Sequence, residues 1–387
     1  MFPSQLLYEA IDAGHIRASE EDPIPVTNIQ PASLDLRLGD FAYRLQCSFL
    51  TDRNSTVEST LADIVMGPPI DLRMGAVLEL HRPYLIPLLE RLELPRHIRA
   101  QTNPKSSTGR LDIFTRVVTD RNYRFDEIPA GYHGRMYLEV VPLSFTIKVG
   151  RGLALNQLRL LIGDARCDDE ELRQIHKSEP LLFRGDRPVP VSDLDVARGL
   201  FLSLDLKGDP DNRIGFRAKK NSRLLDLSSN KTYDWKEFWE PARPVKRGKL
   251  ILEPEEFYLL LSVEGARIPP RWAAEMAAYD PTAGELRTHY AGFFDPGFGY
   301  DKAGTRPGTR AALEVRARDV PFMVEHGQPL AKLQFEEMLF PPDVLYGDES
   351  VQSSYQGQAV MLSKHFRQDD RSHQLDLLPT RPGRVLF

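Results

Sequence analysis

A short segment near residue 105 gathers side chains that suit a negatively charged ligand. It places the ammonium of Lys105, the hydroxyls of Ser106 and Ser107 and the guanidinium of Arg110 around the flexible Gly109. Cationic donors and hydroxyls at this spacing are typical of a site for a polyanion. Taken alone, a string of this length is more often a polar turn that caps a helix. Its meaning therefore depends on the rest of the chain.

Length and composition limit the classes of protein to consider. The chain has 387 residues, enough for two domains with separate cores. With 41% hydrophobic and 27% charged residues it is typical of a soluble globular protein. A net charge of -5 argues against nucleic acid or a membrane surface as general partners, because both require an electropositive face. An anionic ligand would have to be bound by a local cluster of cations.

Cysteine content and hydrophobic runs indicate the compartment. The only two cysteines are Cys47 and Cys167, and the N-terminus carries no hydrophobic signal segment. We therefore expect a reducing cytoplasm and no disulfide framework. No apolar run approaches the length of a membrane span. Two cysteines this far apart cannot form the Pro-Cys-x-x-Cys motif of the zinc-dependent deaminases, so that class of enzyme is excluded.

Turn residues divide the chain into short segments. Thirty prolines and 26 glycines separate β-rich stretches, which we expect at 135–141, 257–263 and 332–335. Helical periodicity is confined to 4–18, with Ser4 as N-cap, and more weakly to 170–177. The pattern predicts a mainly β fold of the sandwich or barrel type.

An internal repeat organises the chain. Gly109 and Gly284 are 175 residues apart, and Leu-Glu-Val at 138–140 recurs at 313–315 with the same offset. Several matches at nearly one offset predict a tandem duplication. We place the first domain at 1–165, a polar connector at 166–198 and the second domain at 199–387.

The two copies have diverged in complementary ways. At the place that matches the Lys105 segment, the second copy has Glu285 instead of Arg110. Conversely, the second copy has a compact Ala-Gly-Phe-Phe-Asp-Pro-Gly-Phe-Gly at 291–299, whereas the first has a longer stretch at 118–134. Each half lacks what the other half contains.

Taken together, the motifs resemble a known family. The Lys105-Ser-Ser-x-Gly-Arg segment, the 291–299 segment, Leu313-Glu314, Tyr346-Gly and Tyr355-Gln-Gly-Gln resemble the dCTP deaminases of the dUTPase-like superfamily. The resemblance implies two tandem distorted β-barrel, jelly-roll-like domains with few short helices. It implies hydrolysis of dCTP to dUTP and ammonia, which feeds dUMP and dTTP synthesis, with Mg²⁺ on the triphosphate and no zinc.

The family also suggests how the halves cooperate. In its single-domain members the site lies between subunits of a trimer: one subunit grips the phosphates, and a neighbour supplies the pyrimidine hairpin and a catalytic Glu. We therefore hypothesise one composite site, in which the first half supplies the phosphate-binding residues and the second half supplies the pyrimidine hairpin. Two halves do not complete a trimer, so a homo-oligomer is a candidate assembly.

Deamination sets the chemical requirement for this site. Water must add at C4 of cytosine and a proton must reach the leaving amine, so one group must both take and give a proton. A carboxyl in a desolvated pocket does this when its pKa is raised towards neutrality. Glu314, on a short apolar strand, is the favoured candidate, and its counterpart Glu139 is the alternative.

The resemblance assigns the other roles. Ser106 and Arg110 would hold the water and stabilise the charge that develops on the ring. Asp35 and Asp205 lie in Ser-Leu-Asp-Leu strands that we expect to serve only the fold, and Ser354 stands where the family often has a phosphate-binding Lys. The expected substrate-binding residues are Lys105, Ser107 and Gln157 for phosphate or Mg²⁺-bridged oxygens, Ala291 to Phe294 for cytosine, Asp295 for the sugar, and Tyr346, Tyr355 and Gln358 for closure over the nucleotide. Gly109 is also expected to contact the substrate.

Two other functions are kept open. The same fold can direct water at phosphorus, which would make the protein a dUTPase or a bifunctional deaminase and dUTPase. A decayed duplicate could instead be a nucleotide-binding regulator without turnover. Release of ammonia separates the deaminase from the dUTPase, and turnover of any kind excludes the regulator.

Overall fold

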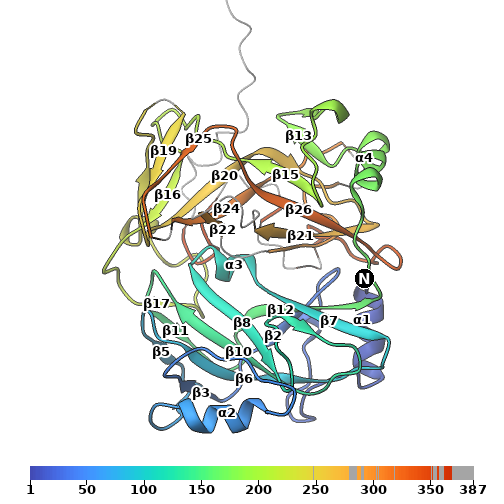
Figure 1. Ribbon diagram of the computed structural model, residues 1–387, viewed down its shortest axis with the longest axis vertical. Helices are drawn as coiled ribbons and strands as arrows, with labels where there is room; N and C mark the ends of the chain where they lie inside the picture. Colours follow the sequence, from blue (N-terminus) through green and yellow to red (C-terminus); the bar gives the residue numbers. More distant parts are fainter. Residues whose placement is uncertain are drawn as a thin grey trace, which may run out of the picture.

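The computed structural model describes residues 1–246, 248–278, 286–288, 292–301, 303, 305–317, 319–349, 351, 355–356 and 361–367. Within these ranges the chain forms many short strands and few helices, so the predicted mainly β class is confirmed. Figure 1 shows the two halves stacked along the long axis, with the N-terminal half below and the C-terminal half above.

The first half is built on two main sheets. One has the strand order β4 (Ile70–Asp71), β3 (Phe41–Arg44), β6 (Tyr84–Glu93), β10 (His133–Pro142), β8 (Ile113–Thr119), and β1 (Ile16–Arg17) also pairs with β6. The other has the order β2 (Leu34–Arg37), β12 (Ala154–Ile162), β7 (Ile98–Pro104), β9 (Glu127–Ile128). Buried positions largely alternate along β6, as expected for a strand with one face on a core.

The second half repeats this plan. One sheet has the order β14 (Arg187–Pro188), β13 (Leu182–Arg184), β20 (Phe257–Ala266), β16 (Gly215–Ala218), β18 (Trp239–Ala242), and β24 (Thr309–Ala317) joins β20 to β22 (Leu286–Thr288). The other has the order β15 (Leu200–Ser203), β26 (Pro329–Glu337), β21 (Trp272–Ala278), β23 (Phe293–Phe294). A small sheet joins β19 (Lys249–Leu252) to β25 (Phe322–Glu325).

The four-stranded sheets of the two halves correspond strand by strand. β12 begins at residue 154 and β26 at residue 329, 175 residues later, which is the offset of the sequence repeat. The three β-rich stretches expected from the sequence lie in β10, β20 and β26. The origin of the two halves by duplication stays a prediction, and the shared strand order is what that prediction requires.

The helices are short. They are α1 (Ser4–Asp12), α2 (Val57–Ile64), α3 (Ser106–Gly109) and α4 (Asp169–Ser178), with single 3₁₀ turns at η1 (Val26–Asn28), η2 (Val191–Asp193) and η3 (Trp235–Glu237). A capping box between Asp168 and Glu171 starts α4, and Leu172 and His176 bury one face of it.

The helix expected at 4–18 is shorter than predicted. Gly14 has a φ of +75°, which ends α1 in the left-handed conformation that glycine adopts without steric cost. Ile16 and Arg17 then pair with β6 as β1. The N-cap prediction was also wrong, because Ser4 is the first helical residue and Pro3 holds the N-cap position.

Residues 166–198 are more than a surface link. They contain α4, β13, β14 and η2, and β13 pairs with β20 of the second half. Five of their side chains lie in the core of that half: Leu172, Leu181, Leu182, Val189 and Leu194.

The core of the first half includes side chains from the second. Phe238 and Trp239 lie at the edge of Phe145 with ring centroids 5.7 and 5.2 Å away, and Phe366 packs against both. In addition, β17 (Leu225–Asp226) adds to the sheet of β11 (Ile147–Val149) and β5 (Ala76–Leu78). The two halves are therefore joined by a shared apolar core.

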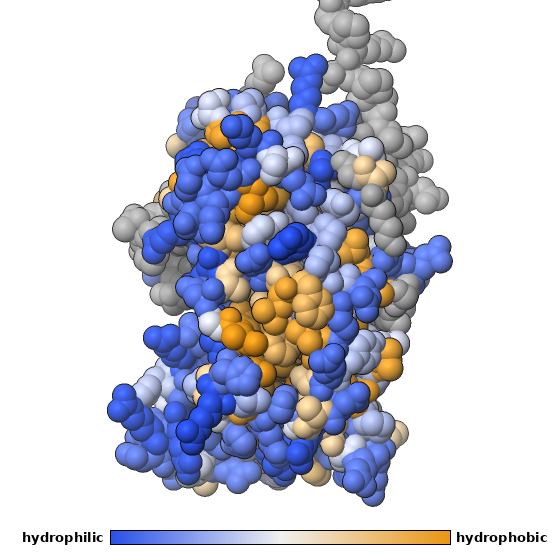
Figure 2. Space-filling model, turned by 90° about the vertical axis from the view of Figure 1, so that its right-hand side faces the viewer, coloured by the Kyte–Doolittle hydropathy of each residue, from blue (hydrophilic) through white to orange (hydrophobic). Residues whose placement is uncertain are grey.

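One side of the molecule carries an apolar surface. Figure 2 shows apolar side chains gathered on the side where Figure 1 places α1. Tyr8, Leu339 and Phe340 are exposed large apolar residues, and the backbone of Leu339 bonds to that of Met1. Surfaces of this kind often mark protein contacts. Self-association stays a prediction.

Candidate functional site

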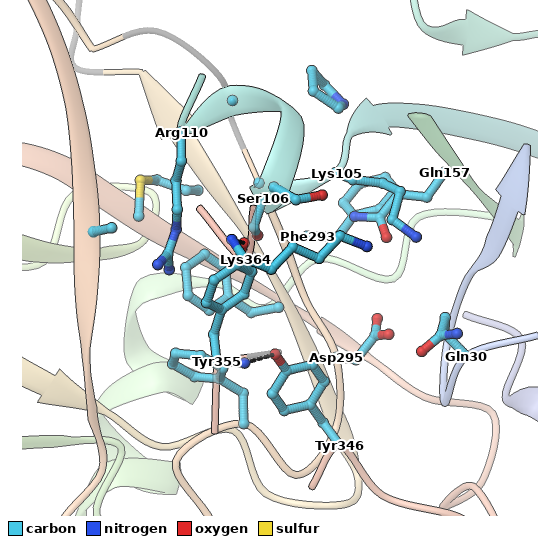
Figure 3. Close-up of a pocket in the computed structure, with 18 of the residues that line it drawn as sticks. Gln30, Lys105, Ser106, Arg110, Gln157, Phe293, Asp295, Tyr346, Tyr355 and Lys364 are labelled. Atoms are coloured by element: carbon cyan, nitrogen blue, oxygen red, sulfur yellow. Dashed lines mark hydrogen bonds between the residues drawn. The ribbon is translucent and has the colours of Figure 1, made fainter. Parts of the chain in front are cut away.

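A pocket opens where the two halves meet. Its cavity measures about 200 Å³ and is lined by both halves of the same chain. Figure 1 shows α3 at this boundary, at the top of the lower half. Figure 3 shows the side chains of Lys105, Ser106, Arg110 and Gln157 from the first half, and of Asp295, Tyr346, Tyr355 and Lys364 from the second, converging on one space.

The segment around Lys105 forms a single helical turn at the end of β7. Lys105 holds the N-cap position of α3 and Arg110 its C-cap, and the amide of Gly109 donates to the Lys105 carbonyl over 3.0 Å. Arg110 leaves this turn towards the second half. Its guanidinium lies 3.7 Å from the ring centroid of Tyr355, and its Nη1 donates to the Met361 carbonyl over 3.1 Å.

Glu314 reaches the pocket from the opposite side. It lies on β24, is 8% exposed, and its Oε2 has no hydrogen-bond partner among the described residues. Burial raises the pKa of Glu314 well above its usual range; Arg110 lowers this pKa and Asp112 raises it further. Glu314 is therefore a buried carboxyl that favours its protonated form.

Gly109 leaves space for the Glu314 carboxyl beside α3. A Cβ atom at position 109 would lie 2.5 Å from Glu314 Oε2 and 2.8 Å from Oε1. A larger residue at position 109 would therefore displace this carboxyl from its place.

The first half also supplies a polar wall. Lys105 forms an ion pair with Asp35, a residue that we expected to serve only the fold. Asp35 Oδ1 is buried without a hydrogen-bond partner in the described part of the chain. Gln157 lies beside them and accepts from the Ser33 hydroxyl over 3.4 Å.

Arg159 ties the second half's hairpin to the first half. Its fully buried guanidinium on β12 donates to Asp295 Oδ1 over 2.8 Å and to the Phe294 carbonyl over 3.0 Å. The same guanidinium lies 3.9 Å from the ring centroid of Phe293. This contact fixes Asp295 at the edge of the pocket.

Aromatic side chains close the far end. The backbone N–H of Tyr355 donates to the Tyr346 hydroxyl over 3.0 Å, shown by the dashed line in Figure 3. Burial raises the pKa of Tyr346, so the hydroxyl stays protonated. Tyr355 is 7% exposed, and its hydroxyl accepts from the Lys364 amide over 3.2 Å.

Glu139, the alternative to Glu314, lies elsewhere. It is fully buried on β10, where Arg116 donates to its Oε1 over 2.6 Å and Ser48 to its Oε2 over 2.7 Å. Its charge is neutralised by this ion pair, and none of the pocket wall comes from it.

Most of the predicted site residues do meet in the pocket. Ala291 and Gln358 lie outside the described residues. The predicted residues that line the pocket are Lys105, Ser106, Ser107, Gly109, Arg110, Gln157, Phe294, Asp295, Glu314, Tyr346 and Tyr355.

Lys364 is a pocket residue that the sequence did not reveal. It follows Ser363, whose hydroxyl donates to the Ser107 carbonyl over 2.9 Å and so anchors the C-terminal segment to α3. Lys364 Nζ has no partner among the described residues. Its pKa is lowered because burial disfavours the ammonium and Lys105 repels it, while Asp35 opposes both effects. Two ammonium groups held this close favour an anionic ligand.

Within the described ranges, no group of three or more His, Cys, Asp or Glu side chains is placed to hold a metal ion. No helix in the same ranges is long and apolar enough to cross a membrane.

Both halves of the chain are similar to known proteins of one family. Family models match residues 1–164, as "2'-deoxycytidine 5'-triphosphate deaminase (DCD) N-terminal domain", and residues 168–366, as the C-terminal domain of the same enzyme. A crystal structure of 2'-deoxycytidine 5'-triphosphate deaminase from Agrobacterium tumefaciens is similar with a TM-score of 0.81 and 44% identity, over 87% of this chain and 98% of that one.

Two curated relatives are more distant. Both are named "dCTP deaminase, dUMP-forming". The protein of Persephonella marina is 29% identical over 140 residues, which cover 35% of this chain and 71% of the relative. That of Corynebacterium efficiens is 26% identical over 159 residues, which cover 40% and 75%.

The raised pKa of Glu314 predicts a pH-dependent stability difference. Between the unfolded pKa, about 4.5, and the higher folded pKa, the folded state keeps a proton that the unfolded state loses. The free energy of unfolding therefore falls as pH rises through this window, by at most about 1.4 kcal/mol per pH unit. Glu314→Gln cannot ionise and so removes the effect. In urea unfolding, the free energy of unfolding of this variant minus that of the unmodified protein should therefore increase with pH above pH 4.5.

Glu139→Gln is the control, because it breaks the ion pair with Arg116. Its free energy of unfolding should be lower than that of the unmodified protein by about 1–3 kcal/mol. An equal pH response in both variants would contradict this description.

Proposed function

Because the chain belongs to the 2'-deoxycytidine 5'-triphosphate deaminase family, we propose that it hydrolyses dCTP to dUTP and ammonia at the pocket between its halves. The observation that supports this most is the buried carboxyl of Glu314 beside Arg110, in a pocket that is also lined by Lys105. A pocket with a cationic wall at one end and a proton-exchanging carboxyl at the other suits a nucleoside triphosphate whose base is the reacting group.

The proposed chemistry uses Glu314 twice. As its carboxylate, it takes a proton from water while the water oxygen bonds to C4 of cytosine, and it then gives this proton to N3. In the second use it takes the remaining proton from the new C4 hydroxyl and gives it to N4, so that the C4–N4 bond breaks, ammonia leaves and C4 becomes a carbonyl. Ser106 and Arg110, on the opposite wall, would orient the water and stabilise the tetrahedral centre. Burial suits Glu314 to both roles by bringing its two protonation states closer in free energy.

The remaining pocket residues bind the rest of the nucleotide in this proposal. Lys105, Lys364, Ser107 and Gln157 would contact the phosphates, and Asp295 the sugar hydroxyl. Tyr355, stacked on Arg110, would help exclude water from the base.

Mg²⁺ fits the phosphate end. Asp35 Oδ1 is a buried carboxylate oxygen without a partner in the described residues, the type of ligand that Mg²⁺ prefers beside substrate phosphates. Asp35 would hold the ion together with the triphosphate, and the ion would supply charge neutralisation there.

A second candidate concerns the product. The two curated relatives are named dUMP-forming, so release of pyrophosphate as well as ammonia is the alternative outcome. Both candidates share the deamination step and differ in whether water also attacks phosphorus.

A single assay tests the proposal. The purified protein with dCTP and Mg²⁺ should release ammonia, followed together with pyrophosphate in the same tube. Glu314→Gln should lower kcat at least about 100-fold, because the general acid–base contribution is lost. Glu139→Gln, provided that it folds, should keep most of the activity.

Other results have definite meanings. Pyrophosphate released in step with ammonia would select the dUMP-forming candidate. Pyrophosphate from dUTP without ammonia from dCTP would make the protein a dUTPase, and no turnover of either nucleotide would leave a binding protein. Loss of activity in Glu139→Gln alone would overturn the assignment of Glu314.

Lys364 provides a separate test of the phosphate end. Lys364→Met should raise KM for dCTP by about 10- to 100-fold with kcat changed only a few-fold, because one charge-assisted phosphate contact is lost in ground state and transition state alike. Steady-state kinetics measure the split. Lys231→Met, at an exposed position of the neighbouring loop, is the matched control. A fall in kcat at unchanged KM would place Lys364 at the reacting base instead.

A further inference from the structure

A second charged pair crosses the junction next to Glu314. Arg316 of β24 donates through Nη2 to Asp112 Oδ2 of the first half, and both side chains are buried, at 8% and 0% exposure. The Ser144 hydroxyl donates to the same carboxylate oxygen over 2.5 Å, and Arg316 Nη1 donates to the Glu255 carbonyl. Burying either charge without its partner would cost free energy. The two halves can therefore pack together only with this ion pair formed.

Asp112 and Arg316 lie next to Arg110 and Glu314 along the junction. Glu314 and Arg316 are two residues apart on β24 and therefore project from the same face of the strand. Arg110 and Asp112 are two residues apart in the segment that leaves α3. Each half thus contributes one cation and one anion to the junction. Arg110 faces Glu314, and Asp112 faces Arg316.

Asp112 is held in an unusual backbone conformation. Its φ of +56° lies in the left-handed region, which few residues other than glycine, Asn and Asp adopt. Two backbone hydrogen bonds keep it there, from its own amide to the Gly109 carbonyl over 2.9 Å and from the Leu143 amide to its carbonyl over 3.0 Å. The carboxylate is thereby aimed at Arg316.

We propose that Asp112 and Arg316 form a positioning pair, which fixes Glu314 beside α3 and balances the charge around it. The inference rests on the proposed function, because Glu314 is the group it serves. Neither residue lines the pocket, so neither touches the nucleotide in this account.

The charges around Glu314 explain why balance matters. From the first half, Arg110 and Asp112 face it with opposite effects on its pKa, which Arg110 lowers and Asp112 raises. From its own strand, Arg316 neutralises Asp112, and the β20 residue paired with Glu314 is the uncharged Leu259. If Asp112 lost its charge, the positive charges of Arg110 and Arg316 would no longer be offset. They would stabilise the carboxylate form of Glu314 and lower its pKa.

The test compares pH profiles of kcat/KM for dCTP. Asp112→Asn keeps the size of the side chain and a residue type that tolerates the left-handed backbone. It should move the acidic limb of the profile to lower pH by about one unit or more. The double variant Asp112→Asn with Arg316→Met removes both charges and should return the limb towards its original position.

A matched control lies on the same strand. Arg310 of β24 pairs with Asp205 over 2.5 Å within the second half, and neither side chain lines the pocket. Asp205→Asn should leave the pH profile unchanged. If Asp112→Asn lowers activity only in proportion to lost stability, with no shift of the limb, or if the double variant does not reverse the shift, the pair is merely structural and the inference is overturned.

A readout without turnover separates this inference from the proposed function. At pH 8, Glu314→Gln should change the free energy of unfolding less in the Asp112→Asn background than in the unmodified protein. The reason is that the buried carboxylate of Glu314 is less costly once the charge of Asp112 is gone. An unchanged difference would overturn the inference even if dCTP is deaminated. Absence of ammonia release by the unmodified protein would refute the proposed function, while a narrowed difference would still support the charge balance.

Discussion

The burial of the Glu314 carboxyl against α3 is the constraint on which the rest of the structure depends. The carboxyl lies so close to residue 109 that a side chain there would displace it, and the charges of Arg110 and Asp112 act on it in opposite directions. Such an environment exists only while the two halves are held together, because each contributes one wall. The site is therefore a property of the junction, and the folding energy that holds the junction also sets the chemistry of the carboxyl.

Contacts outside the pocket also join the two halves. An aromatic cluster around Trp239 places side chains of the second half in the core of the first, and β17 extends a sheet of the first half. Arg159 reaches in the opposite direction, from the first half into the hairpin that carries Asp295. Because apolar packing and buried polar contacts cross in both directions, we regard the halves as one cooperative unit.

The sequence predicted the plan of this protein better than its details. The offset of 175 anticipated the matching strand orders, and the complementary motifs of the two halves anticipated a pocket lined by both. It favoured Glu314 but left Glu139 open as the alternative, because both stand in the same Leu-Glu-Val context. The packing distinguishes them, because Arg116 lies against Glu139 and the pocket lies beside Glu314. Lys364 was missed because its place depends on the path of the chain after Tyr355, which local patterns do not specify.

The most direct test of a site built within one chain is complementation between two inactive variants. Arg110→Met and Glu314→Gln chains with different tags are co-expressed, purified through both tags, and assayed for ammonia release from dCTP beside a doubly tagged complex of unmodified chains; separately purified variants are also mixed. If each pocket takes both walls from one chain, neither preparation regains activity. Activity restored to a sizeable fraction of that of the unmodified complex would show that one chain grips the phosphates while another supplies the carboxyl, and would contradict the account.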